Sequence, residues 1–483
     1  MKIYKYLLLG FLVFAGISCE DQLELEPQQS VSTDAAFETL KDFENAVLGM
    51  YEGMQDQLYY GRNYPALGDA SSDNGQIPDG AGARLTVFYT MALNPINTTG
   101  GGWERMYNVI SRSNNIINRI DGLSTATEAE RNQVKGEALF VRALVHFDLV
   151  RQFAQDYNFT SDQSHLGVPY IEVTEIGEPE RNTVGEVYSN VLRDLNEAES
   201  LMGNTTSQEA DQASKMAAVA LRARLKLYMG DFSGALTDAN NVIDNGGYSL
   251  ANYMLMVDDD NDPSTPDVVD LDNIDSWSSP NPTSESIFEL ETSVTDQEFP
   301  GLEGLASIYQ RDDGYGDLGP SLDIINLYDA DDVRQSWYLN VAGVWFVEKY
   351  PGQGGNSQWF TTPILRLSEM VLIKAECHAR LNQNTEAQTA INEITSRANA
   401  PAINSTGADL LADILEERRR ELAFEGHRYF DLKRLQEDIV RNDCNLTNGN
   451  CLIPYGNRLF TYPIPQAETD ANPNMIQDEG WRN

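Results

Sequence analysis

The segment from Glu416 to Leu435 constrains the fold most strongly, because it carries one continuous helical pattern. An apolar stripe follows helical spacing, and charged side chains lie within reach of one another on neighbouring turns. The charged positions are Glu417, Arg418, Arg420, Glu421, Arg428, Asp431 and Arg434. Gly426 interrupts the stripe and allows two helical pieces to meet at an angle. The pattern predicts a salt-bridged helix pair facing a core, and favours this over a catalytic role.

Helical periodicity also dominates the first half of the chain. Val134 to Phe153 places apolar residues at helical spacing. A further helix is expected from Thr183 to Met202, where Thr183 and Glu186 form the spacing of a capping box. These segments predict a mainly α fold.

Two segments suggest paired, stacked helices. The Ala-rich helices Met216 to Tyr228 and Ser233 to Asp244 are joined by Gly230, which resembles a tetratricopeptide turn. A weaker copy occurs at Ala379 to Ile394. The expected architecture is therefore a tetratricopeptide-like helical repeat scaffold.

Residues 56–104 and 252–362 differ from these helical segments, because they are rich in Gly, Pro, Asn, Asp and Ser. We expect long loops there, and long loops in a compact protein often bind ligands. Short strands are expected at Ser286 to Glu291 and Trp337 to Glu348, where β-branched and aromatic residues concentrate. The β component should be minor.

The N-terminus has the features of an export signal. Lys2 and Lys5 precede an apolar run from Tyr6 to Ile17 that is too short to span a bilayer, and Cys19 follows small residues. This arrangement resembles a lipoprotein cleavage site, which would make Cys19 the lipidated first residue. A plain secretory signal is the alternative. No later segment is apolar for long enough to suggest a transmembrane helix.

The charge balance excludes one class of ligand. The 483 residues include 34 Lys and Arg against 74 Asp and Glu, a formal net charge of −40. A field of that sign repels phosphate backbones, so nucleic acid is not an expected partner.

The remaining cysteines have separate expected roles. Cys444 and Cys451 flank a short Asn- and Gly-rich loop and are expected to form a local disulfide. Cys377 lies on an apolar helix face and is expected to be a buried thiol.

The segment Glu416 to Leu435 resembles the signature of the SusD/RagB family, a group of Bacteroidetes outer-membrane lipoproteins. Further segments resemble the family in the same order along the chain: Trp103 to Ile120, 136–153, Arg181 to Tyr188, Leu365 to Ala379, and the closing YPIPQAETDANPNMIQDEGW. The resemblance spans nearly the whole chain after Cys19. It implies four segments, namely a signal peptide (1–18), a lipidated tether (19–35), an N-terminal helical part (36–250) and a C-terminal part with binding loops and the signature helix (251–483).

The same resemblance implies a function. Glu20 and Asp21 resemble the acidic signal that sends such lipoproteins to the outer face of the outer membrane. The family implies capture of oligosaccharide or polysaccharide and its delivery to a SusC-like TonB-dependent transporter. The RagB branch leaves peptide as an alternative ligand.

Carbohydrate recognition stacks sugar rings on aromatic side chains and satisfies hydroxyls with polar ones. The first loop region offers polar candidates: Asp69, Asp73, Asn74 and Arg84. The second offers rings and a cation: Trp277, Tyr309, Arg311 and Tyr315. Packing within the protein is the alternative role for each aromatic residue, and it is the role expected of Trp103 and Trp345.

The sequence indicates no enzyme and no cofactor. It lacks HExxH, GxSxG and Walker motifs, and with 74 acidic residues no carboxylate pair is informative. The acidic run Asp258 to Asn273 raises calcium binding as a secondary hypothesis. Pro263 stands where an EF-hand loop needs glycine, so a solvated acidic loop is the primary interpretation.

Overall fold

The structure is a computed structural model of the whole chain. It describes residues 36–96, 100–204, 209–251, 284–291, 300–311, 314–350, 358–444 and 450–482. The predictions for Cys19, Trp277 and the acidic run Asp258 to Asn273 lie outside the described residues.

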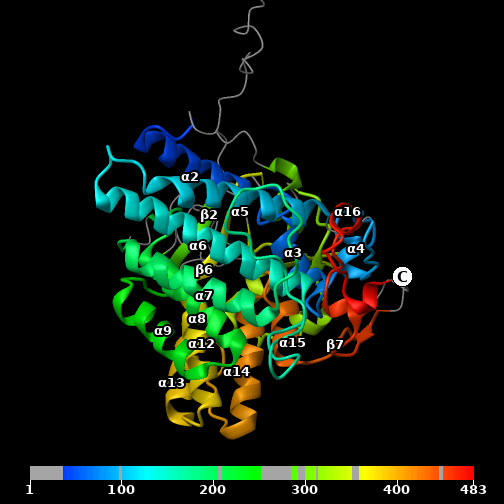
Figure 1. Ribbon diagram of the computed structural model, residues 1–483. Coiled ribbons are helices and arrows are strands. Elements are labelled where there is room, and N and C mark those ends of the chain that lie inside the picture. The colour runs from blue at the N-terminus through cyan, green and yellow to red at the C-terminus, as the bar shows by residue number, and fades with distance from the viewer. Residues whose placement is uncertain are drawn as a thin grey trace, which may run out of the picture.

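The scaffold is a stack of long helices, as expected for a mainly α fold. Its members are α2 (Leu40–Met54), α5 (Gly100–Ile120), α6 (Glu128–Phe153), α7 (Val184–Leu201), α8 (Lys215–Met229), α9 (Phe232–Asn245), α12 (Leu367–Arg380), α13 (Asn384–Arg397) and α14 (Gly407–Glu421). Each packs against its neighbour, and Figure 1 shows them layered from α2 and α5 at one end to α13 and α14 at the other. Helix pairing is confirmed, while the tetratricopeptide comparison stays a prediction.

Local sequence signals begin and end these helices. Thr183 caps α7 by accepting a hydrogen bond from the Glu186 backbone, and the Glu186 side chain bonds back, so the predicted capping box is present. Gly230 ends α8 in the left-handed conformation with φ of 79°. On α6 the whole span from Gly136 to Phe153 is buried, because other elements surround this helix.

The shorter elements lie beside the stack. The short α-helices are α3 (Asn63–Ala70), α4 (Thr86–Tyr89), α10 (Leu305–Tyr309), α11 (Leu322–Ile325), α15 (Arg428–Leu435) and α16 (Gln466–Ala471). The 3₁₀ helices are η4 (Gly301–Glu303), η5 (Val333–Trp337), η6 (Arg458–Phe460) and η7 (Glu479–Trp481). Thus the region 56–104, expected as a loop, contains two short helices, and Tyr59, Tyr60 and Tyr64 from it join the main core.

The β component is minor, as expected. The strands are β1 (Gly75–Gln76), β2 (Ser286–Glu291), β3 (Gly319–Pro320), β4 (Tyr338–Val341), β5 (Val344–Val347), β6 (Thr361–Arg366), β7 (Ile439–Val440) and β8 (Leu452–Ile453). They form antiparallel pairs β1 with β3, β2 with β6, β4 with β5, and β7 with β8. The strand predicted at Ser286 to Glu291 is β2, and the region Trp337 to Glu348 forms the β4–β5 hairpin.

The C-terminal segment contacts the region around α4 on one side of the stack. Figure 1 shows the C-terminal segment beside α4, which comes from the first part of the sequence. The Gln466 amide donates to the Pro95 carbonyl at 2.8 Å, and Arg441 donates to the Tyr89 carbonyl at 2.6 Å. The main core contains residues from both sides of position 250, so the division into parts at that position stays a prediction.

The signature segment folds as the sequence indicated. α14 ends at Glu421, α15 begins at Arg428, and Gly426 between them has φ of 82°. The backbone of α3 lies so close that a Cβ on Gly68 would stand 2.3 Å from the Gly426 carbonyl oxygen. Both positions therefore need glycine.

Buried ion pairs fix this junction to the scaffold. Glu421 is fully buried and pairs with Arg366 at 2.7 Å, with Arg334 at 3.0 Å and with Arg397 at 2.5 Å. Burial alone would raise the pKa of Glu421, but the three arginines outweigh it and hold the pKa well below its usual value. We call these four residues the Glu421 network.

Candidate functional site

One exposed arrangement of aromatic and charged groups lies where the two loop regions of the sequence meet. The guanidinium carbon of Arg84 lies 3.6 Å from the ring centroid of Tyr315, and 40% of Tyr315 is exposed. A ring partly open to solvent beside a cation is suited to stacking against a flat ligand face. Both residues are among the ligand contacts predicted from the sequence, and they come from segments far apart in the chain.

Two carboxylates hold Arg84 in this position. Its Nε and Nη2 donate to Glu303 at 3.0–3.1 Å, and its Nη1 donates to Asp317 Oδ2 at 3.0 Å. Hydrogen bonds from Arg84 lower the pKa of Glu303, although partial burial opposes this. Arg62 adds a second cation to Glu303 at 2.6 Å. The guanidinium is therefore preorganised, with one face on the ring.

The loop that carries Tyr315 is also fixed. The Tyr315 amide donates to the Ser307 carbonyl at 2.6 Å, and the Asp317 amide donates to Ile308 at 2.7 Å. Phe346 on β5 covers Gly316, since a Cβ there would stand 2.6 Å from the Phe346 ring. We call Arg84, Glu303, Tyr315, Asp317 and Phe346 the Arg84 platform.

Sequence reasoning did not select three platform residues. Glu303 and Asp317 were indistinguishable among 74 acidic residues, and only their contacts with Arg84 identify them. Phe346 lies within the predicted strand region, where an aromatic residue by itself indicates packing. Trp345 is half-buried and packs against the main core, which agrees with its expected packing role.

The polar candidates Asp69, Asp73 and Asn74 require a correction, because the protein buries them. Asp69 accepts hydrogen bonds from the Phe424 and Gly426 amides, both at 3.0 Å, and from Asn74 at 2.9 Å. Burial raises the pKa of Asp69 to about 6, with these hydrogen bonds opposing the shift. The cluster joins α3 to the signature junction and is closed to a ligand.

Asp73 is committed to the same junction. Its carboxylate accepts from Arg428 at 2.7 and 2.8 Å and lies 3.2 Å from Arg419. These charge-assisted bonds satisfy both oxygens within the protein. Asp73 is therefore a structural residue in this fold and not a ligand contact.

The remaining candidates separate by exposure. Tyr309 is fully buried and stacks on Tyr350 with centroids 5.7 Å apart, so it also requires correction to a packing role. Arg311 is exposed, two residues after α10. Of the candidates within the described residues, Arg84, Arg311 and Tyr315 thus stay accessible.

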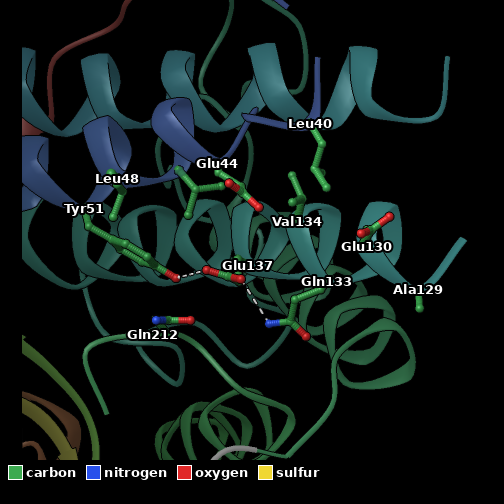
Figure 2. Close-up of a pocket in the computed structure, with 11 residues that line it drawn as sticks. Leu40, Glu44, Leu48, Tyr51, Ala129, Glu130, Gln133, Val134, Glu137 and Gln212 are labelled. Atoms are coloured by element: carbon green, nitrogen blue, oxygen red, sulfur yellow. Dashed lines mark hydrogen bonds between the residues drawn. The ribbon is translucent and has the colours of Figure 1, made fainter. Parts of the chain in front are cut away.

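A hollow of about 560 Å³ between α2 and α6 is a different kind of site (Figure 2). Leu40, Val47, Leu48 and Val134 contribute apolar surface to it. Tyr51 donates to Glu137 at 2.7 Å and is only 6% exposed, so its ring offers no free face. The hollow lacks the exposed ring expected for sugar stacking and contains none of the candidates from the sequence.

The cysteines occupy the predicted positions. Cys444 and Cys451 form a disulfide with their Cα atoms 5.6 Å apart, and Cys377 is a buried free thiol. Burial raises the pKa of Cys377 above its usual range, which leaves it unreactive.

Membrane-spanning helices and metal sites are both absent from the described residues. No helix there is long and apolar enough to cross a membrane. No group of His, Cys, Asp or Glu side chains there has a metal-binding arrangement. The acidic run considered for calcium lies outside that part of the chain.

The helical scaffold presents a partly exposed ring, Tyr315, beside a fixed cation, Arg84. This arrangement is typical of a binding protein. Comparison with known proteins agrees. The model of the SusD family matches residues 335–481, and one described as "Starch-binding associating with outer membrane" matches residues 21–227. The chain belongs to the SusD family.

Individual relatives cover almost the whole chain. SusD-like protein P2 of Formosa agariphila is 26% identical over 524 residues, which span 99% of both proteins. The starch-binding protein SusD of Bacteroides thetaiotaomicron is 23% identical over 77% of each. A solved SusD superfamily protein of Bacteroides vulgatus is 30% identical with a TM-score of 0.81, and covers 92% of this chain and 100% of that one.

Proposed function

We propose that this protein is a non-catalytic cell-surface lipoprotein that captures oligosaccharide or polysaccharide. The observation that carries the proposal is the Arg84 platform, where Tyr315 is 40% exposed and held against Arg84. An exposed ring with fixed polar neighbours suits a pyranose, because the ring covers the apolar sugar face while the side chains bond its hydroxyls. Family membership supports the same ligand class.

The setting of this activity is also proposed from the family. Cys19 would carry the lipid that anchors the protein to the outer membrane, facing outward. The captured glycan would pass to a SusC-like TonB-dependent transporter. Arg311 and Trp277 stay proposed ligand contacts on the basis of the sequence alone.

Calorimetry against a panel of neutral glucans, mannans and fructans tests the proposal, with a peptide mixture alongside. One polysaccharide should bind without release of reducing ends. Tyr315→Ala should weaken that binding about five- to tenfold, as expected for loss of one stacking ring. Tyr309→Phe is a matched control, because Tyr309 is buried.

Two outcomes would contradict this proposal. Binding of peptides with no response to any glycan would move the protein to the RagB-type alternative. Binding of a glycan that is unaffected by Tyr315→Ala would keep the ligand class and exclude the platform as its site.

A further inference from the structure

A second pocket lies at the C-terminal end of the chain, built from residues that the proposed glycan site does not use. Its volume is about 540 Å³, within the range of about 300–1,000 Å³ for small-molecule sites. One part of the lining follows α6 and includes Gln155 and Phe159, and the other surrounds η6 and η7 and includes Arg458, Asp478 and Trp481. Segments about 300 residues apart thus form one hollow.

Two hydrogen-bond acceptors in this pocket lack partners. Gln155 Oε1 and Asp478 Oδ2 are both buried atoms without a hydrogen bond in the described part of the chain. The other carboxylate oxygen of Asp478 accepts from Arg181 at 3.0 Å, which fixes the direction of the group. Buried acceptors are costly unless a donor meets them, so a ligand with hydroxyl or ammonium donors fits here.

Two exposed guanidinium groups, those of Arg458 and Arg482, line the pocket. Neither has a carboxylate at ion-pair distance among the described residues; Arg482 Nε donates to the Gln477 carbonyl at 2.8 Å. Burial raises the pKa of Asp478, and the charge of Arg482 acts to lower it. The lack of a carboxylate at ion-pair distance is unusual in a chain with 34 basic and 74 acidic residues, where most described arginines are paired. An anionic group on the ligand would form ion pairs with both guanidinium groups.

The aromatic part of the pocket is held in place. The Arg458 guanidinium lies 3.9 Å from the ring centroid of Trp481, whose Nε1 donates to the Thr461 carbonyl at 3.2 Å. Gly480 permits this, because a Cβ there would stand 2.6 Å from the Arg458 Cβ. Phe159 adds a ring that is 43% exposed. The pocket therefore combines fixed cations, free acceptors and an open ring.

We infer that this pocket binds a small sugar acid, with its hydroxyls donating to Gln155 and Asp478 and its carboxylate held by Arg458 and Arg482. Phe159 would cover the apolar face of the sugar ring. The inference goes beyond the proposed function and does not depend on it, because the two sites share no residue.

Saturation-transfer NMR with the full chain in a sugar-free detergent tests the inference, using glucuronate, glucose and alanine as probes. We expect glucuronate to bind with a dissociation constant on the order of 1 mM, and glucose to bind about tenfold more weakly. Alanine tests whether a zwitterion is preferred, since its ammonium and carboxylate would meet the same groups.

Two variants in the pocket locate the binding, and two more serve as controls. Arg458→Gln removes one cation and Gln155→Leu removes one acceptor at similar size, and each should weaken glucuronate binding about tenfold. Lys41→Gln, which removes an exposed positive charge on α2, is the charge-matched control and should have no effect. Tyr315→Ala should also leave glucuronate binding unchanged, which separates this test from that of the proposed glycan site.

The inference is overturned if glucuronate shows no saturable binding up to tens of millimolar, or if both pocket variants bind it as well as the native protein. Equal binding of glucose would remove the role of the arginines. Tighter binding of alanine would replace the sugar acid with an amino acid as the ligand class.

Discussion

The Glu421 network and the Arg84 platform are built from the same kinds of side chain and differ in burial. Glu421 is closed to solvent and has three arginine partners, whereas 40% of the Glu303 side chain is exposed and it has two, Arg62 and Arg84. In water the attraction between charges is screened and two freed charges are easily hydrated. In the interior, removal of one partner leaves charges that nothing compensates.

The comparison teaches that the charge pattern alone does not assign a role. The buried network joins α14 to strand β6, to η5 and to the end of α13, so it stabilises the fold. The platform has a smaller effect on folding and keeps a ring and a guanidinium in contact with solvent, where a ligand can reach them. Four predictions test this difference in burial.

The largest effect is expected for Glu421→Gln. The substitution keeps the side-chain size and removes the charge, so three buried arginines lose their common partner. The free energy of unfolding should fall by about 3–5 kcal/mol, measured by urea denaturation followed by circular dichroism. Glu416→Gln on the same helix is the control, because Glu416 is half exposed and should cost under about 0.5 kcal/mol. A loss below about 1 kcal/mol for Glu421→Gln would contradict the assigned role.

The Glu421 network also predicts that the free energy of unfolding decreases at acid pH. The folded-state pKa of Glu421 lies well below its ordinary value of 4.5, so the unfolded chain takes up a proton first as the pH falls. The contribution is therefore complete above about pH 5.5 and is lost progressively below it. Burial raises the pKa of Asp69 to about 6, so its contribution to stability changes with pH in the opposite direction. Asp69 is present in both the native protein and the Glu421→Gln variant, so this contribution is common to the two profiles. Denaturation from pH 7 to pH 4 should show a flatter profile for Glu421→Gln, and parallel profiles would count against the prediction.

An intermediate effect is expected for Asp73→Asn, which weakens the bonds to Arg428 and Arg419. The free energy of unfolding should fall by about 1–3 kcal/mol. Glycan affinity of the folded fraction should not change, because Asp73 is buried. A selective loss of affinity with unchanged stability would instead return Asp73 to the ligand contacts.

The smallest effect on stability is expected for Glu303→Gln, the exposed counterpart of Glu421→Gln. The free energy of unfolding should change by less than about 1 kcal/mol, since the pair is partly solvated. Glycan affinity should fall about three- to tenfold, because Arg84 is no longer held firmly against Tyr315. If stability fell as much as for Glu421→Gln, the two clusters would not differ in the way that burial implies.

The sequence predicted the helical parts of the fold well, because their signals are local. The capping box at Thr183, the turn at Gly230 and the joint at Gly426 each depend on residues a few positions apart. The strand at Ser286 to Glu291 was identified by composition in the same way. The region 56–104 was misread as a loop because its helices are short and its tyrosines pack against distant partners such as Phe430.

The candidate site was predicted less completely. Of the predicted ligand contacts, Arg84 and Tyr315 are partly exposed, whereas Asp69, Asp73, Asn74 and Tyr309 are buried. Loop composition identifies polar and aromatic residues without distinguishing those that face solvent from those that face the core. Phe424 and Gly426, which lie about 355 residues away in sequence, determine the burial of Asp69.

By itself the sequence determined the helical class, the boundaries of α7, α8 and α9 to within one residue, the local disulfide and the family, because caps, turns and short-range motifs are encoded within a few residues. Tertiary structure alone decided which arginines are buried, which carboxylates hold Arg84 flat on Tyr315, and that Gln155 meets Asp478 in one pocket. These pairings join segments tens to hundreds of residues apart. Electrostatic strength and ligand access both depend on burial, which arises only when the chain has packed.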